Sequence, residues 1–279
     1  MKIAFLLLLA ASSVFAAEEK TFTPPSEREI PNNDFGNVIK LGKSIFTDTQ
    51  HYAKKFAGNG LNCVNCHLDS GRKANSSPLW GAYVRYPAYR AKTRQVNTFE
   101  ERLQGCFMFS LNGTPPPLGS PEMTALVSYA YWMSTGVPVG TKPKGAGYPE
   151  LPKPALAPDF SRGKEVYAAN CQVCHGTNGE GKMDGDKFAF PPLWGNESFN
   201  WGAGMHRINT AAAFIKANMP LSKGDSLSDQ EAWDVAQFVM SHDRPIDPRA
   251  KGGVAAAKKE YHDENCRYGD TVDGKILGE

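Results

Sequence analysis

The chain carries the same five-residue motif twice, and this duplication limits the folds that it can adopt. The motif reads "CVNCH" at residues 63–67 and "CQVCH" at residues 171–175. Two cysteines separated by two residues and followed directly by histidine form the attachment sequence of c-type haem, in which the histidine ligates the iron. Redox disulfides and zinc sites also use paired cysteines, but neither requires that histidine. The sequence therefore predicts two covalently bound haem c groups, held by Cys63, Cys66, His67, Cys171, Cys174 and His175.

A longer repeat surrounds both motifs. "GKSIF" at residues 42–46 precedes the first motif, "GKEVY" at 163–167 precedes the second, and "PLWG" follows each. Each half then closes with an apolar segment that opens on a serine N-cap, Ser120 in the first half and Ser228 in the second. The repeat indicates two copies of one small helical unit. We therefore predict an all-α fold of two cytochrome c-like domains.

The segments outside the two units differ in composition. The opening "MKIAFLLLLAASSVFA" has one lysine, an apolar run and then small residues, which is typical of a secretory signal peptide. "GTKPKGAGYPELPKPALAP" is rich in proline and glycine and is predicted to be an extended linker. The expected boundaries are a signal peptide at 1–16, an N-terminal cytochrome c domain at 17–140, a linker at 141–158, a C-terminal cytochrome c domain at 159–250 and a strap or loose tail at 251–279.

Export follows from the signal peptide. We expect cleavage after Ala16, and no later apolar stretch is long enough to span a bilayer, so the mature protein is predicted to be periplasmic without a membrane span. The formal net charge is only +2. Nucleic acid is not an expected partner of an exported haem protein with so little excess charge.

The second unit offers a clear sixth iron ligand. "KANMPLSKG" places Met219 before a proline, 44 positions after His175. A thioether sulfur is a soft ligand that favours reduced iron and raises its potential. The competing side chains lack the Met-Pro context; they are Met183, Met205, Met240 and His206.

The first unit has a cysteine where the second has that methionine. Counted from the tryptophan of each "PLWG", Met219 lies 25 positions after Trp194, and Cys106 lies 26 positions after Trp80. Cys106 is therefore the predicted sixth ligand of the first haem. A thiolate is a strong anionic donor that lowers the potential of its iron, so electrons are expected to flow from the first haem to the second.

Other roles for Cys106 stay open at this point. It can be a buried free thiol, or it can form a disulfide with Cys266, the other cysteine outside the haem motifs. Met108 is the nearest rival ligand.

Basic residues gather just before Cys106. Seven of them lie between residues 72 and 105 against two glutamates, namely Arg72, Lys73, Arg85, Arg90, Lys92, Arg94 and Arg102 against Glu100 and Glu101. Guanidinium groups suit the oxygens of a sulfonate or phosphate, so an anionic substrate is expected. Some of these side chains can instead bind haem propionates or face solvent.

Several of these motifs together resemble one known family. In "CVNCH", "NSSPLWGAYVRYPAYR", "ERLQGCF", the "SPEM" helix start, "CQVCHG" and "NMP", the chain is similar to the di-haem thiosulfate dehydrogenases, also described as tetrathionate-forming or tetrathionate-reducing cytochromes. The resemblance implies a catalytic first haem ligated by His67 and Cys106, and a second that transfers electrons. It implies the coupling of two thiosulfates into tetrathionate, or the reverse reduction. It places these catalytic residues near the substrate: Cys106, Ser77, Arg85, Arg94 and Gln104.

The expected partners are thiosulfate or tetrathionate and a soluble or membrane-linked cytochrome that accepts or donates electrons. Two other functions remain compatible with the same motifs. One is a non-catalytic di-haem electron carrier, and the other is a haem subunit of a larger sulfur-oxidising complex.

Overall fold

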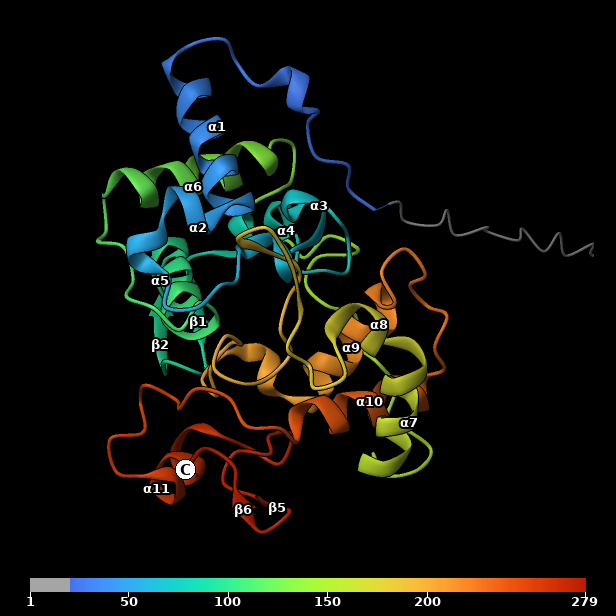
Figure 1. The fold of residues 1–279 in the computed structure, drawn as a ribbon. Helices are drawn as coiled ribbons and strands as arrows, with labels where there is room; N and C mark the ends of the chain where they lie inside the picture. The colour runs from blue at the N-terminus through green and yellow to red at the C-terminus, as the bar shows by residue number, and fades with distance from the viewer. Residues whose placement is uncertain (1–20) are drawn as a thin grey trace, which may run out of the picture.

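The structure is a computed structural model that describes residues 21–279, so the signal peptide expected at 1–16 lies outside the described residues. Helices dominate, and the strands form three separate two-stranded hairpins within the described part of the chain. Figure 1 shows the N-terminal helices packed together at the top and the C-terminal ones below them. The predicted all-α class is confirmed.

The N-terminal half is built on two crossing helices, α1 (Asp34–Thr47) and α6 (Pro121–Met133). The Ser120 side chain accepts a hydrogen bond from the Met123 backbone amide, so α6 begins where its sequence predicts. The shorter elements between them are α2 (Thr49–Tyr52), α3 (Leu68–Gly71), α4 (Leu79–Ala82), β1 (Ala88–Arg90), β2 (Gln95–Asn97) and α5 (Phe99–Gly105).

The C-terminal half repeats this plan with α7 (Phe160–Asn170) packed against α10 (Asp229–Met240). Helix α10 begins with a capping box formed by Ser228 and Glu231. Between the two helices lie α8 (Gln172–His175), β3 (Lys182–Asp184), β4 (Lys187–Phe190) and α9 (Ile208–Asn218).

The glycine of each "GK" repeat explains why the sequence is duplicated there. A Cβ atom on Gly42 would lie 2.0 Å from the Ala125 carbonyl oxygen of α6. A Cβ atom on Gly163 would lie 2.0 Å from the Asp234 carbonyl oxygen of α10. Both glycines therefore permit a close crossing of the first and last helix of a unit, at the same place in each copy.

The segment between the halves, residues 141–158, has no helix or strand and touches both units. The backbone amides of Asn75 and Ser77 donate to the carbonyl oxygens of Gly145 and Gly147. Further along, the indole of Trp233 in α10 donates to the Pro152 carbonyl oxygen over 2.9 Å. Both units therefore hold the segment on their surface, as an extended linker requires.

The C-terminal strap, defined here as residues 251–279, is folded rather than loose. It contains α11 (Val254–Tyr261), β5 (Thr271–Val272) and β6 (Lys275–Ile276), seen at the bottom of Figure 1. Its side chains surround Trp201 in a second small core with Ala257, Cys266, Tyr268 and Leu277. Within residues 21–279, the helices are all too short or too polar to cross a membrane.

Candidate haem and substrate sites

A cavity of about 710 Å³ opens in the N-terminal half beside the first haem motif. Cys63, Cys66 and His67 line it, and so does Cys106. The rest of its wall mixes apolar side chains such as Phe46 with several basic ones. The cavity thus brings together the attachment cysteines, the proximal histidine and the cysteine predicted as the sixth ligand.

Both motif histidines are oriented in the same way. The Nδ1 atom of His67 lies 2.7 Å from the Ser77 carbonyl oxygen, and that of His175 lies 2.8 Å from the Pro191 carbonyl oxygen. A carbonyl oxygen only accepts, so Nδ1 carries the proton and Nε2 keeps its lone pair for a metal. Burial lowers the pKa of both imidazoles, to about 4 for His67, so they stay neutral.

The four motif cysteines are half-buried, and none is paired in a disulfide. Two unpaired cysteines followed by a neutral histidine with a free Nε2 are the donor set that covalent haem attachment needs. The residues of both motifs therefore fit a haem c.

Cys106 opens a π-helical turn (Cys106–Ser110) that continues directly from α5. The Leu111 amide donates to the Cys106 carbonyl oxygen over 3.0 Å, which closes this wider turn. Such turns are rare and often mark functional sites. Cys106 lies on the cavity wall. Met108, in the same turn, packs against the core and is not among the described residues that line the cavity.

Arg102 contacts Cys106, and this contact was not predicted from the sequence. Its Nη1 atom donates to the Cys106 sulfur over 2.8 Å. Electrostatic attraction to Cys106 raises the pKa of Arg102, against the opposing effect of burial. The four-residue spacing of these two side chains on a helix was the available signal, because residues so spaced share one face.

The disulfide alternative for Cys106 is wrong, because Cys106 and Cys266 are both free thiols. Cys106 lines the cavity, and Cys266 lies buried in the strap at 3% exposure.

The predicted substrate residues divide into two groups. Ser77 and Arg85 line the cavity beside Cys106. Arg94 instead donates through Nη2 to the Glu260 carbonyl oxygen over 3.2 Å, and Gln104 donates through Nε2 to the Pro116 carbonyl oxygen over 2.9 Å. The structure therefore places Ser77 and Arg85 on the wall of the cavity that Cys106 lines, but it does not place Arg94 or Gln104 there. The catalytic roles of all four residues stay predictions.

Further basic side chains reach the cavity from the β1–β2 hairpin. Arg90 lies at its wall and donates to the Tyr86 hydroxyl over 2.5 Å. Burial lowers the pKa of Lys92 to about 7, and the nearby charge of Arg249 adds to this effect. Burial, followed by the charge of Arg102, also lowers the pKa of Arg90. Crowded, partly desolvated cations of this kind gain most when an anion enters between them.

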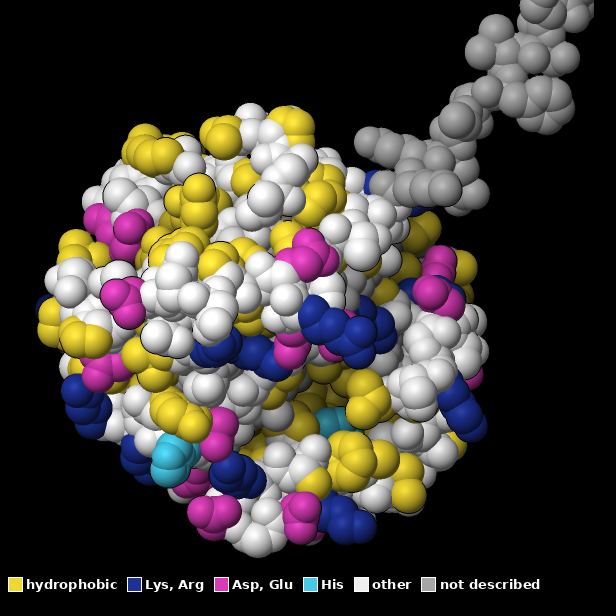
Figure 2. Space-filling view, turned by 90° about the horizontal axis from the view of Figure 1, so that it is seen from above, with side chains coloured by type: hydrophobic (Ala, Val, Ile, Leu, Met, Phe, Trp, Pro, Cys, Tyr) yellow, Lys and Arg dark blue, Asp and Glu magenta, His cyan; other side chains and the backbone are white. Residues whose placement is uncertain are grey.

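The face of the molecule drawn in Figure 2 does not share this basic character. On the face shown in Figure 2, lysine and arginine side chains lie among acidic ones, and a hollow with a hydrophobic floor opens between them. Both signs are mixed there, which agrees with the net charge of +2. The cations of the cavity are therefore a local feature.

In the C-terminal half, Met219 directly follows α9 and is half-buried. The side-chain amide of its neighbour Asn218 donates through Nδ2 to the Asn75 carbonyl oxygen over 3.0 Å, and this hydrogen bond connects the loop to the N-terminal half. Of the competing side chains, Met240 is buried in α10, Met183 is 49% exposed in β3, and Met205 and His206 line the cavity of the N-terminal half. The ligand role of Met219 stays a prediction.

Comparison with known proteins covers both halves. The family model described as "SoxA/TsdA, cytochrome c domain" matches residues 48–139. The model described as "Cytochrome C oxidase, cbb3-type, subunit III" matches residues 158–239. Each match contains one haem motif, so the chain has two cytochrome c domains with two covalently bound haem c groups.

Several relatives that span most of the chain are named thiosulfate dehydrogenase. The thiosulfate dehydrogenase of Stutzerimonas stutzeri is 55% identical, with 94% of this chain and 87% of that protein covered. That of Thiomonas intermedia is 58% identical, with 92% and 82% covered. The solved thiosulfate dehydrogenase TsdBA from Marichromatium purpuratum, in its as-isolated form, has 44% identity and a TM-score of 0.91. That match covers 94% of this chain but 58% of the longer solved chain. At this identity and coverage, the chain belongs to the thiosulfate dehydrogenase family of di-haem c-type cytochromes.

Proposed function

We propose that this protein oxidises thiosulfate and couples two thiosulfate ions into tetrathionate with the release of two electrons, a reaction that can also run in reverse. The observation that carries this proposal is the position of Cys106, whose sulfur shares one cavity with His67 and receives a hydrogen bond from Arg102. We propose thiosulfate as the substrate because the relatives are named thiosulfate dehydrogenase.

The cavity wall suits a sulfur oxyanion. Arg85, Arg90 and Arg102 all line it, and guanidinium groups pair with oxyanions through parallel hydrogen bonds. Two dianions must approach each other before they can couple. Fixed positive charges inside a cavity offset that repulsion more effectively than solvated ones, because little water remains to screen them.

We assign the iron ligands as His67 and Cys106 in the first domain and His175 and Met219 in the second. When bound, the haems take up electrons singly, at lower potential where the ligand is Cys106 and at higher potential where it is Met219. The Ser77 and Pro191 carbonyl oxygens hold the two histidine rings in the tautomer that ligation requires.

Cys106 also supplies the reacting sulfur. Cys106 would leave or loosen from the iron, and its thiolate would then form a sulfur–sulfur bond with the sulfane sulfur of the first thiosulfate. This oxidation releases two electrons, which the two haems would accept one at a time. The second thiosulfate attacks that sulfane sulfur and breaks its bond to Cys106. Tetrathionate leaves, and Cys106 returns as a thiolate that Arg102 stabilises.

Replacement of Cys106 tests this mechanism. Cys106→Gly should keep both covalent haems and their reduction by dithionite, because neither motif is altered, while thiosulfate-dependent reduction disappears. Haem content from the pyridine haemochrome spectrum is the control for correct assembly. A variant with two haems and undiminished thiosulfate oxidation would show that the cysteine does not react.

The biological setting is part of the same proposal. The signal peptide at 1–16 sends the protein to the periplasm, where the catalytic domain at 17–140 passes electrons to the electron-transfer domain at 159–250. A second cytochrome, soluble or membrane-linked, then exchanges electrons with the latter.

A further inference from the structure

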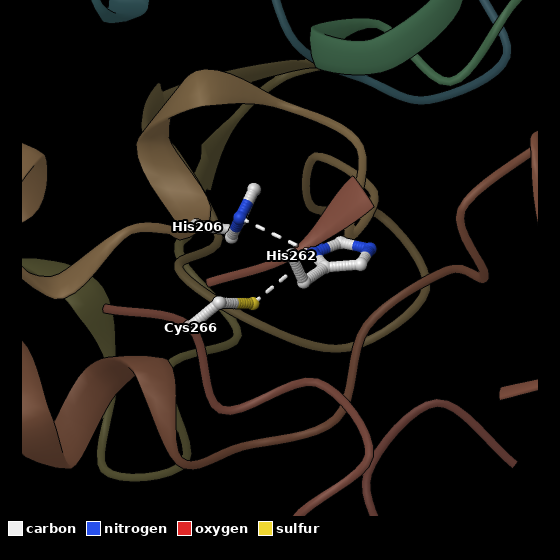
Figure 3. Close-up of side chains that lie close together, drawn as sticks. All are labelled: His206, His262 and Cys266. Atoms are coloured by element: carbon white, nitrogen blue, oxygen red, sulfur yellow. Dashed lines mark hydrogen bonds between the residues drawn. The ribbon is translucent and has the colours of Figure 1, made fainter. Parts of the chain in front are cut away.

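Three buried side chains outside both haem motifs converge on one point, as Figure 3 shows. His206 ends a short 3-10 turn (Gly204–His206), while His262 and Cys266 follow α11 in the strap. Their ligand atoms all lie within 4.8 Å of one another. His206 is 5% exposed, Cys266 is 3% exposed, and the His262 side chain has no exposed surface. We call these three residues the His–His–Cys cluster.

The hydrogen bonds of His206 fix which of its nitrogens faces the cluster. Its Nδ1 atom is hydrogen-bonded to the Ala203 carbonyl oxygen, which only accepts, so Nδ1 carries the proton. The Nε2 atom therefore keeps its lone pair, and it lies 3.4 Å from Nδ1 of His262. Burial, with a further effect of His262, holds the pKa of His206 well below its ordinary value.

His262 is oriented in a complementary way by Asp247. The Nε2 atom of His262 lies 3.1 Å from Asp247 Oδ2, and both side chains are fully buried. Burial would raise the pKa of Asp247, but hydrogen bonds from His262 and Arg249 hold it well below its ordinary range. The carboxylate accepts from Nε2 of His262, so Nδ1 is the ring nitrogen that faces the cluster. Tyr268 stacks on the imidazole at 4.5 Å between ring centroids and helps to hold its plane.

Three ligand atoms therefore face one another at the centre of the cluster. Nδ1 of His262 lies 3.4 Å from Nε2 of His206 and 3.2 Å from the Cys266 sulfur. Two imidazole nitrogens and one sulfur gathered in a buried site form a donor set that transition-metal ions of the zinc type bind.

The spacing fits a metal ion. Zinc bonds of about 2.0 Å to nitrogen and about 2.3 Å to sulfur at tetrahedral angles place two nitrogens about 3.3 Å apart, and a nitrogen and a sulfur about 3.5 Å apart. The corresponding separations here are 3.4 Å and 3.2 Å. Carboxylate-to-histidine support of the Asp247–His262 kind is the usual outer shell of zinc-bound histidine. We propose that His206, His262 and Cys266 bind one divalent transition-metal ion of the Zn²⁺ type, with Asp247 as the positioning residue.

The cluster joins the strap to the wall of the substrate cavity. His206 lines that cavity, as do Arg249, which precedes the strap, and Tyr261, the last residue of α11. An isolated antiparallel bridge between Arg207 and Cys266 runs alongside, and the Ile208 amide donates to the Asn265 carbonyl oxygen over 2.8 Å. A metal ion at this position fastens the C-terminal strap to the segment before α9 and so fixes one side of the cavity.

Metal content of the di-haem protein tests this proposal. After incubation with Zn²⁺ and removal of the excess on a desalting column, the protein should contain one zinc for every two irons by mass spectrometry. Cys266→Ser and His262→Gln should each lose that zinc. His51→Gln makes the same chemical change at an exposed position outside the cluster and should retain it. Asp247→Asn should bind zinc about 10- to 100-fold more weakly.

Zinc K-edge absorption of the unaltered protein gives a readout that needs no variant to fold. It should show one sulfur and at least two nitrogen neighbours, because the cluster supplies that set. Zinc bound by oxygen alone, zinc retained equally by the His262 and Cys266 variants with two haems each, or no retained zinc would each overturn the proposal.

Discussion

The hydrogen bond from Arg102 to the Cys106 sulfur should contribute measurably to catalysis. The proposed mechanism returns Cys106 as a thiolate, and the 2.8 Å contact with Arg102 Nη1 is a charge-assisted hydrogen bond. Such bonds contribute about 1.5–3 kcal/mol. If the bond is formed fully only when the sulfur is anionic, its loss lowers kcat/KM about 10- to 150-fold, at about 1.4 kcal/mol for each tenfold change.

The assay is the steady-state rate of thiosulfate oxidation with ferricyanide as electron acceptor. Arg102→Gln keeps a donor but removes the charge and should fall in the stated range. Arg102→Lys keeps the charge without the guanidinium fork and should lie between that variant and the unaltered protein. Arg28→Gln makes the same change at an exposed position and should have no effect. Unchanged kcat/KM in an Arg102→Gln protein with two haems would refute the reasoning.

Two further predictions concern the helix crossings. Gly42→Ala forces a Cβ against the Ala125 carbonyl oxygen, so thermal unfolding should show a loss of about 1–3 kcal/mol, whereas Gly204→Ala, with no atom within 4 Å of the new Cβ, should not. Burial would raise the pKa of Asp234, but hydrogen bonds, above all the one from the Arg162 side chain, lower this pKa on balance. The ionised Asp234 carboxylate therefore stabilises the fold at pH values above the pKa of about 4 that it has in the unfolded chain. Asp234→Asn should therefore lower Tm at pH 7, and the deficit should shrink as pH falls to about 3; a deficit independent of pH would contradict this assignment.

The elements that the sequence predicts well are those whose signals are local. Each of these signals spans only a few residues. They are the haem motifs, the serine N-caps of α6 and α10, and the repeated "GK" glycines. Their physical causes are equally local, since a cap satisfies amides in the next turn and the two thioether bonds of a haem c need two nearby thiols. The duplicated fold follows from them because both copies carry the same signals in the same order.

The cavity wall is harder to predict, because its residues meet only after folding. Lys92, which lies on the wall in the structure, reaches the Gly202 carbonyl oxygen in the other half of the chain. Arg94, which the family resemblance placed near the substrate, instead reaches Glu260 of α11. A basic segment indicates an anion site, but the partners of each side chain depend on where the distant strap lies. No spacing within the segment carries that information.

The His–His–Cys cluster also consists of residues that meet only after folding, and it lies where the strap meets the cavity wall. His206 and His262 are separated by 56 positions, and no motif links them. Yet the strap and the residues next to it place Arg249 and Tyr261 on the cavity wall, and the linker adds Tyr148, whose pKa is raised above its ordinary range by burial. The segment at 199–210 adds further residues to the wall, among them His206, so three segments that follow the first domain in the chain complete its cavity. The basic character of the cavity therefore depends on the folding of the whole chain, and the first haem motif alone does not determine it.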